Sequence, residues 1–105
     1  MPLKAAVAEV ESARAHIRLA GRVQGVGFRY YTADEARRRH LSGWVRNLDS
    51  GGVEAVFEGP RKVIEDMLRW CNEGPSGAYV RDLQTAWDEP PEHLTGFEIR
   101  GTAGY

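Results

Sequence analysis

Cysteine is nearly absent from this chain of 105 residues, since Cys71 is the only one. A single cysteine cannot form a disulfide within the chain, so nothing indicates an oxidising compartment. Neither sign of charge dominates, and the formal net charge of −1 argues against a dedicated nucleic-acid binder, which is usually strongly basic. No apolar run approaches the roughly 20 residues that a membrane span needs. These absences predict a cytoplasmic protein that contacts neither membrane nor nucleic acid.

Residues 1–14 lack the hydrophobic region of a signal peptide, because Glu9 and Glu11 lie among the alanines and valines. We expect these residues to form a flexible extension. The remainder, 15–101, contains no internal repeat, no low-complexity segment and no linker. It is long enough for a single hydrophobic core. The sequence therefore predicts one domain, and we expect it to be a monomer.

Residues that bind metals or act as nucleophiles are also sparse. His16, His40 and His93 show no metal-ligand spacing and have no nucleophile beside them in the sequence. Cys71 falls on the side of a predicted helix that we expect to be packed, where a thiol is inert. We predict no metal site and no cofactor.

The periodicity of apolar residues predicts strands and helices in alternation. Ile17, Leu19 and Val23 alternate with arginines as in a strand with one buried face, and Asp49-Ser50-Gly51-Gly52 is typical of a hairpin turn. The expected elements are strands near 17–23, 42–48, 53–58, 78–87 and 97–100, with helices over 28–40 and from Pro60 onward. This order predicts an α+β fold of the ferredoxin-like, split β-α-β type, with two helices on one face of an antiparallel sheet.

Two details stay open at this stage. The apolar parity of the fourth strand slips between Val80 and Leu83, which a β-bulge or a misplaced strand boundary would explain equally well. The second helix has two candidate apolar sides, Val63, Met67 and Trp70 or Ile64, Leu68 and Cys71. The three tryptophans, at 44, 70 and 87, are expected to be buried or half-buried packing residues.

The stretch from Gly21 to Arg29 joins the first strand to the first helix and contains three glycines. Glycine adopts positive φ without steric cost, so backbone N–H groups in such a turn can converge on one point. The following helix adds its unpaired N–H groups and the positive end of its dipole. Arg29 adds a guanidinium group that suits phosphate oxygens. The spacing alone also fits an ordinary glycine-rich connection, since it is neither a P-loop nor a Gly-x-Gly-x-x-Gly pattern.

A second motif lies downstream of this stretch. Gly43-Trp44-Val45-Arg46-Asn47 is followed by Gly51, Val53 and Gly59. Together the two segments resemble the signatures of the acylphosphatase family, Gly-x-Val-Gln-Gly-Val-x-Phe-Arg and Gly-Trp-Val-Arg-Asn-x-x-x-Gly-x-Val-x-x-x-x-x-Gly. Both fit without a gap, and the resemblance runs from about residue 17 to residue 100.

The resemblance implies metal-independent hydrolysis of acyl phosphates to a carboxylate and inorganic phosphate. It implies that Arg29 binds the phosphate and that Asn47 orients the attacking water. The phosphate-binding loop would comprise Gln24, Gly25, Val26, Gly27 and Phe28. Asparagine suits its role because it accepts a hydrogen bond from water and does not ionise. Gln24 could contribute its backbone rather than its side chain, and Arg46 projects to the face opposite Asn47 by strand parity.

Two other functions compete with this one. RNA-recognition domains of the same topology use aromatic residues on the open face of the third strand. Here Glu54 and Glu58 share that face with Val56, and carboxylates would repel a phosphate backbone. Acylphosphatase-like domains also begin large hydrogenase-maturation carbamoyltransferases, but the zinc-finger cysteines expected next in such a protein are missing. A stand-alone enzyme is therefore the expectation.

Overall fold

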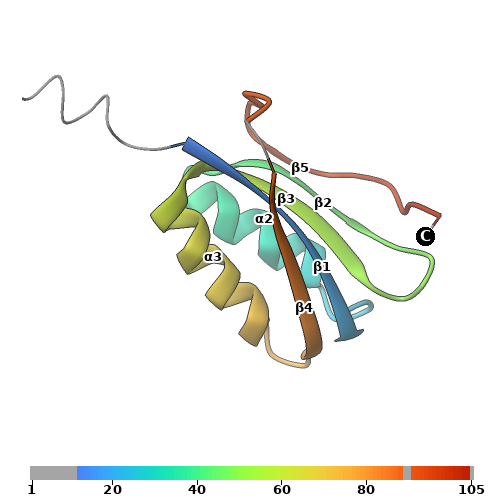
Figure 1. The fold of residues 1–105 in the computed structure, drawn as a ribbon. Helices are drawn as coiled ribbons and strands as arrows, with labels where there is room; N and C mark the ends of the chain where they lie inside the picture. Colours follow the sequence, from blue (N-terminus) through green and yellow to red (C-terminus); the bar gives the residue numbers. More distant parts are fainter. Residues whose placement is uncertain (1–11, 89–90, 105) are drawn as a thin grey trace, which may run out of the picture.

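The computed structural model describes residues 12–88 and 91–104, which form one layer of strands and one layer of helices (Figure 1). Most of the predicted extension, residues 1–11, lies outside the described part. In chain order the elements are β1 (Ser12–Arg22), α2 (Phe28–Arg38), β2 (Ser42–Asn47), β3 (Val53–Pro60), α3 (Arg61–Glu73), β4 (Tyr79–Asp88) and β5 (Phe97–Ile99). Within the described residues, no helix is long and apolar enough to cross a membrane.

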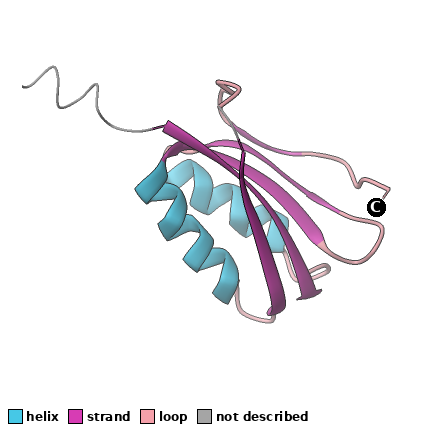
Figure 2. Cartoon of the chain, viewed as in Figure 1, coloured by secondary structure: helices cyan, strands magenta, loops and turns pink. Residues whose placement is uncertain are grey.

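The sheet has the strand order β4-β1-β3-β2-β5, and both helices cover the same face of it (Figures 1 and 2). Neighbouring strands are antiparallel except β2 and β5, which are parallel. The predicted α+β, ferredoxin-like split β-α-β fold is confirmed. The hairpin between β2 and β3 is also confirmed, with Asn47 opposite Val53 at its closed end.

The core lies between the sheet and the helices, and strand alternation decides which residues enter it. Ile17 of β1, Ala55 of β3 and Val45 of β2 stand in one row across the sheet and are fully buried. Because side chains alternate between faces, every second residue of these strands points toward the helices. α2 closes the core with Phe28 and Ala33 among others, and Phe28 packs against Trp70 with ring centroids 6.0 Å apart.

The structure resolves both details that the sequence left open. The register between β1 and β4 shifts where Ala20 pairs with Asp82 and Gly21 with Val80, so a β-bulge at Arg81 is confirmed. Neither candidate apolar side of α3 is correct as a set, because its buried residues are Ile64, Met67 and Cys71. Each candidate set was one straight row, whereas the helix buries a stripe that takes members from both.

Several boundaries differ from the sequence expectations by one to five residues, among them the starts of β1 and α3. β1 begins at Ser12 and pairs with Pro60, so residues 12–14 are part of a strand and not of the predicted extension. α3 begins at Arg61 with Pro60 as its N-cap, one residue later than expected. Proline fits at the N-cap for the same reason as at the first helical position, because no intrahelical hydrogen bond from its nitrogen is needed there.

The face of the sheet away from the helices buries two carboxylates beside apolar residues. Glu54 and Glu58 of β3 are 1% and 5% exposed, and Val56 lies between them. Arg46 donates to Glu54 at 2.7 Å, and Nε2 of His16 lies 2.6 Å from the same carboxylate. The expectation that Glu54 and Glu58 repel RNA assumed that both present free negative charge to solvent. In the structure both are buried, so they do not. This face of β3 nevertheless carries no aromatic residue on which a base could stack.

Candidate active site

The order of the strands brings two distant segments to one end of the sheet. β3 lies between β1 and β2 and is antiparallel to both. The carboxyl ends of β1 and β2 therefore lie at the same end of the sheet. Val53 pairs with Leu19 on one side and with Asn47 on the other. The connection 23–27 that follows β1 therefore leaves the sheet beside Asn47, and α2 begins there.

The connection has the backbone that its glycines predict. Gly25 has φ of 76°, and Gly27, the N-cap of α2, has φ of 77° in the left-handed region. No side chain caps α2, and its first turn contains no acidic residue. The first N–H groups of a helix lack intrahelical partners and carry the positive end of the dipole. Such a terminus, entered by a glycine-rich loop, can bind an anion.

Arg29 is the second residue of α2 and is half-buried. Its Cζ lies 5.6 Å from the centre of the Tyr30 ring. Among residues 12–88 and 91–104, no carboxylate forms an ion pair with it, in contrast to Arg38, which pairs with both Asp34 and Glu35. The arginine at the start of α2 thus differs from two arginines near its end, which form ion pairs with acidic residues of the same helix.

Asn47 ends β2 with its side chain on the helix-covered face, because it has the same parity as the buried Val45. Its Oδ1 is buried and has no hydrogen-bond partner in the described part of the chain, a condition shared only with Oγ1 of Thr32. Buried acceptors are normally satisfied, so such an atom requires an explanation. The main chain of Asn47 is held firmly, since its carbonyl accepts from Ala103 N at 3.0 Å.

Gln24 joins the two halves of the site through its side chain. Nε2 donates to the carbonyl oxygens of Leu48 and Gly52, both at 2.7 Å. These two carbonyls belong to the turn that directly follows Asn47. The amide therefore ties the loop after β1 to the turn after β2. The sequence analysis places Gln24 in the phosphate-binding loop but does not predict these two hydrogen bonds. No spacing within either motif indicates them.

Other residues near the motifs lie away from this end or inside the core. The side chain of Phe28 is 1% exposed and packs in the core, so only its backbone can contribute to the loop. Arg46 projects to the open face as predicted and stacks on Trp44, 4.7 Å from the ring centre.

Burial tends to raise the pKa of Glu54, but the hydrogen bonds from Arg46 and His16 outweigh it and hold that pKa below its ordinary value.

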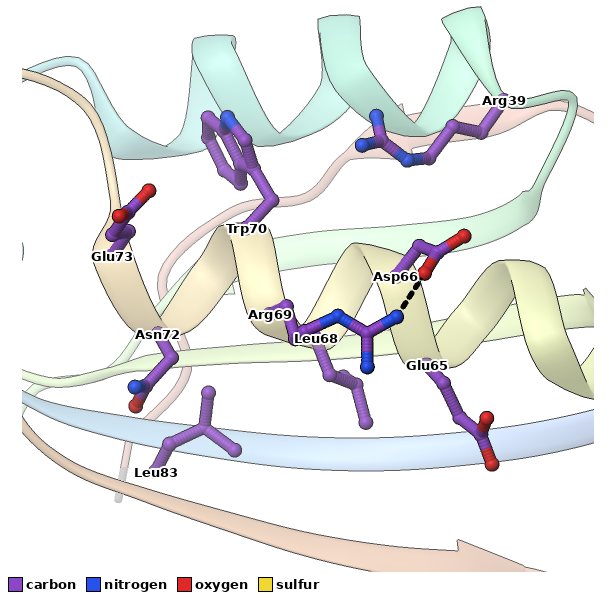
Figure 3. Close-up of a pocket in the computed structure, with 9 residues that line it drawn as sticks. All are labelled: Arg39, Glu65, Asp66, Leu68, Arg69, Trp70, Asn72, Glu73 and Leu83. Atoms are coloured by element: carbon purple, nitrogen blue, oxygen red, sulfur yellow. Dashed lines mark hydrogen bonds and ion pairs between the residues drawn. The ribbon is translucent and has the colours of Figure 1, made fainter.

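Cys71 is fully buried in α3, and burial raises the pKa of its thiol, which favours the uncharged form. A surface pocket lies over α3, with Trp70, Leu68 and Leu83 among its lining residues and an ion pair between Arg69 and Asp66 at its rim (Figure 3). None of the residues that the sequence placed in the active site lines this pocket. In the described ranges, no group of three or more His, Cys, Asp or Glu could hold a metal ion.

Comparison with known sequences identifies the family of this chain. A family model described as Acylphosphatase matches residues 15–99. The chain belongs to the acylphosphatase family. The resemblance that the two motifs indicated is thereby confirmed, and the family makes this chain an enzyme.

Individual acylphosphatases are similar over most of their length. An acylphosphatase of Nostoc sp. is 58% identical over 87 residues, which are 83% of this chain and 85% of that protein. The crystal structure of acylphosphatase from Bacillus subtilis has a TM-score of 0.82 at 36% identity, covering 84% of this chain and 98% of that one. Full-length HypF, crystallised in a phosphate- and nucleotide-bound form, has a TM-score of 0.83 at 32% identity over 90% of this chain but only 12% of its own.

Proposed function

We propose that this chain hydrolyses the carboxyl–phosphate bond of acyl phosphates without a metal ion, to a carboxylate and inorganic phosphate. In this proposal Arg29 and the backbone of residues 24–28 bind the phosphoryl group, and Asn47 orients the attacking water. Family membership supports the hydrolysis itself. The roles of individual residues rest on the local chemistry of the site.

The unpartnered Oδ1 of Asn47 is the observation that carries the proposal. A buried carbonyl oxygen without a donor is costly, by about 1–3 kcal/mol. Water can donate a hydrogen bond to it, and the oxygen of that water then has its lone pairs free for attack. Asn47 lies at the end of the sheet where the glycine loop and α2 begin, so a water held there would be close to an anion bound by the loop.

Arg29 and the loop suit the phosphoryl group for electrostatic reasons. The half-buried guanidinium has no carboxylate partner among the described residues, so its charge is not already neutralised by one. A planar guanidinium can donate two parallel hydrogen bonds to phosphate oxygens. The left-handed Gly25 and Gly27 allow successive N–H groups to face the same anion.

The reaction needs little beyond this. The water oxygen attacks phosphorus, the bond between phosphorus and the acyl oxygen breaks, and the electron pair leaves with the carboxylate. We assign the water's proton to an oxygen of the substrate's own phosphoryl group, because the motifs contain no stronger base than Asn47. A carboxylate is a good leaving group, so catalysis depends on positioning and on neutralising the charge of the phosphoryl oxygens.

The test uses purified protein with benzoyl phosphate, and a simple phosphomonoester as the control substrate. We expect turnover of benzoyl phosphate only, at a rate that EDTA leaves unchanged, with inorganic phosphate as a competitive inhibitor. A loss of activity with EDTA that Mg²⁺ restores would contradict the metal-independent mechanism. Non-competitive inhibition by phosphate would place the anion site elsewhere.

A further inference from the structure

Exposed aromatic side chains concentrate near the start of α2. Among residues 12–88 and 91–104, three large hydrophobic side chains are strongly exposed, those of Tyr30 (64%), Tyr31 (54%) and Tyr79 (64%). Tyr30 and Tyr31 directly follow Arg29 in the first turn of the helix. Large rings left in water beside a ligand site indicate a surface that receives an apolar part of the ligand.

Both rings lie beside residues proposed to bind the phosphoryl group. Cε2 and Cδ2 of Tyr31 lie 3.2 and 3.4 Å from the position that a Cβ on Gly27 would occupy, so this ring lies against the loop. The Tyr30 ring lies beside the guanidinium of Arg29, at 5.6 Å from its Cζ. The backbone fixes this arrangement, because Tyr31 N donates to Gly27 O at 3.0 Å.

The chemistry of the substrate decides what these rings meet. In an acyl phosphate a single oxygen separates phosphorus from the acyl carbon, so a phosphoryl group bound by Arg29 and the loop leaves the acyl group within reach of neighbouring side chains. Aromatic faces stack favourably on flat apolar groups. An extended acyl group would cover ring surface that is now in water, whereas an acetyl group is too small to cover much of it.

We infer that Tyr30 and Tyr31 form the acyl-binding surface of the enzyme and favour acyl phosphates whose acyl group is flat and apolar. The inference rests on the proposed function, since it takes Arg29 and the loop as the phosphoryl site. The two tyrosines act on specificity, through contact with the acyl group.

Tyr79 provides a matched control. It is as exposed as Tyr30, but it lies on β4 and pairs with Arg22 of β1. By strand parity Tyr79 and Arg22 face away from the helices, since the neighbouring pair, Val80 and Gly21, faces toward them and Val80 packs against the core. An effect of removing any exposed ring from the surface would therefore appear equally in Tyr79→Ala.

The experiment compares kcat/KM for benzoyl phosphate with kcat/KM for acetyl phosphate in the parent, Tyr30→Ala, Tyr31→Ala and Tyr79→Ala. We expect the ratio of the two constants to fall about three- to tenfold in each of the first two variants, the size of one aromatic contact. Tyr79→Ala should keep the parental ratio. Tyr31→Phe should keep it as well, because stacking needs the ring and not the hydroxyl.

Each other outcome has a defined meaning. An unchanged ratio in Tyr30→Ala and Tyr31→Ala, with the parent active on both substrates, would overturn the acyl-binding surface and leave the proposed function standing. Equal losses on both substrates would do the same and would indicate that the rings support Arg29 or the loop. A fall in the ratio of Tyr79→Ala would show a general surface effect. A parent that hydrolyses neither compound would overturn the proposed function, and this inference with it.

Discussion

At the scale of single residues, Arg29 and Asn47 are expected to fail in different ways when they are changed. Asn47→Ala removes the oxygen that we propose to orient water, so kcat should fall by about 10²–10³-fold while phosphate binds nearly as well as in the parent. Arg29→Lys keeps the charge but loses the planar guanidinium, so phosphate affinity and kcat/KM should both fall severely. Calorimetry with inorganic phosphate and kinetics with benzoyl phosphate separate the two effects.

Two surface residues provide controls of the same type. Arg38→Lys changes an exposed arginine of α2 that already pairs with Asp34 and Glu35. Asn72→Ala changes an exposed asparagine of α3. Both variants should keep the parental affinity and rate. Loss of phosphate binding in Asn47→Ala would make Asn47 a substrate ligand, and an Arg29→Lys protein with parental kcat/KM would remove the phosphate contact from the proposal.

The sequence predicted single residues well where a short-range rule applies. Strand parity placed Arg46 and Asn47 on opposite faces, and the structure confirms it for Arg46 through its contacts with Glu54 and Trp44. The hydrogen bonds from Gln24 to Leu48 and Gly52 lay beyond such rules. They depend on how two loops meet after the sheet has formed, and a glutamine side chain has no spacing that reveals its partner.

At the scale of elements, β3 depends on a buried carboxylate whose partners come from both neighbouring strands. Glu54 contacts Arg46 of β2 and His16 of β1, and Arg18 of β1 lies 3.9 Å away. Despite the opposing effect of burial, the hydrogen bonds from Arg46 and His16 keep the pKa of Glu54 below 4.5. The unfolded carboxylate therefore takes up its proton at a higher pH than the folded one. The stability that Glu54 provides is complete above the unfolded pKa and is lost as the pH falls through the folded one.

Glu54→Gln should lower the free energy of unfolding at pH 7 by about 1–3 kcal/mol, because the partly buried guanidinium of Arg46 loses the charged carboxylate that accepts its hydrogen bond. The difference from the parent should shrink as the pH is lowered from about 5 to about 3. Urea unfolding followed by tryptophan fluorescence measures both. Glu98→Gln, which removes an exposed partner of Arg100, should change stability by less than about 1 kcal/mol. A constant difference across this pH range would contradict the lowered pKa.

Elements were predictable from the sequence to within a few residues because hydrophobic periodicity is local. The bulge at Arg81 left a visible slip in the apolar parity of β4, which confirms one of the two explanations offered for it. The buried stripe of α3 was not predicted correctly. The rotation of the helix against the sheet decides which of its apolar residues enter the core. The two apolar rows in the sequence allowed several rotations, and the one observed buries Ile64, Met67 and Cys71.

At the scale of the whole molecule, the C-terminal segment completes the sheet next to the candidate active site. β5 runs parallel to β2, and the pairing continues past it, where Ala103 N donates to Asn47 O and Asp49 N donates to Ala103 O. The sequence predicted a closing strand near 97–100 but not its neighbour. A short strand carries too little pattern to specify which edge of a sheet it joins, so this contact became visible only in the fold.

These hydrogen bonds join the end of the chain to the backbone of the residue proposed to orient water. A protein that ends at Gly101 keeps the bond from Arg100 N to Val45 O but loses both bonds of Ala103. Because small shifts of a positioned group cost much of its catalytic effect, kcat for benzoyl phosphate should fall by about 10- to 10²-fold. Phosphate affinity should change less than kcat, since the two hydrogen bonds of Ala103 go to Asn47 and Asp49 and not to Arg29 or the loop after β1. A protein that lacks only residue 105 is the control. Parental kcat in the protein ending at Gly101 would show that Gln24 and the hairpin alone hold Asn47 in place.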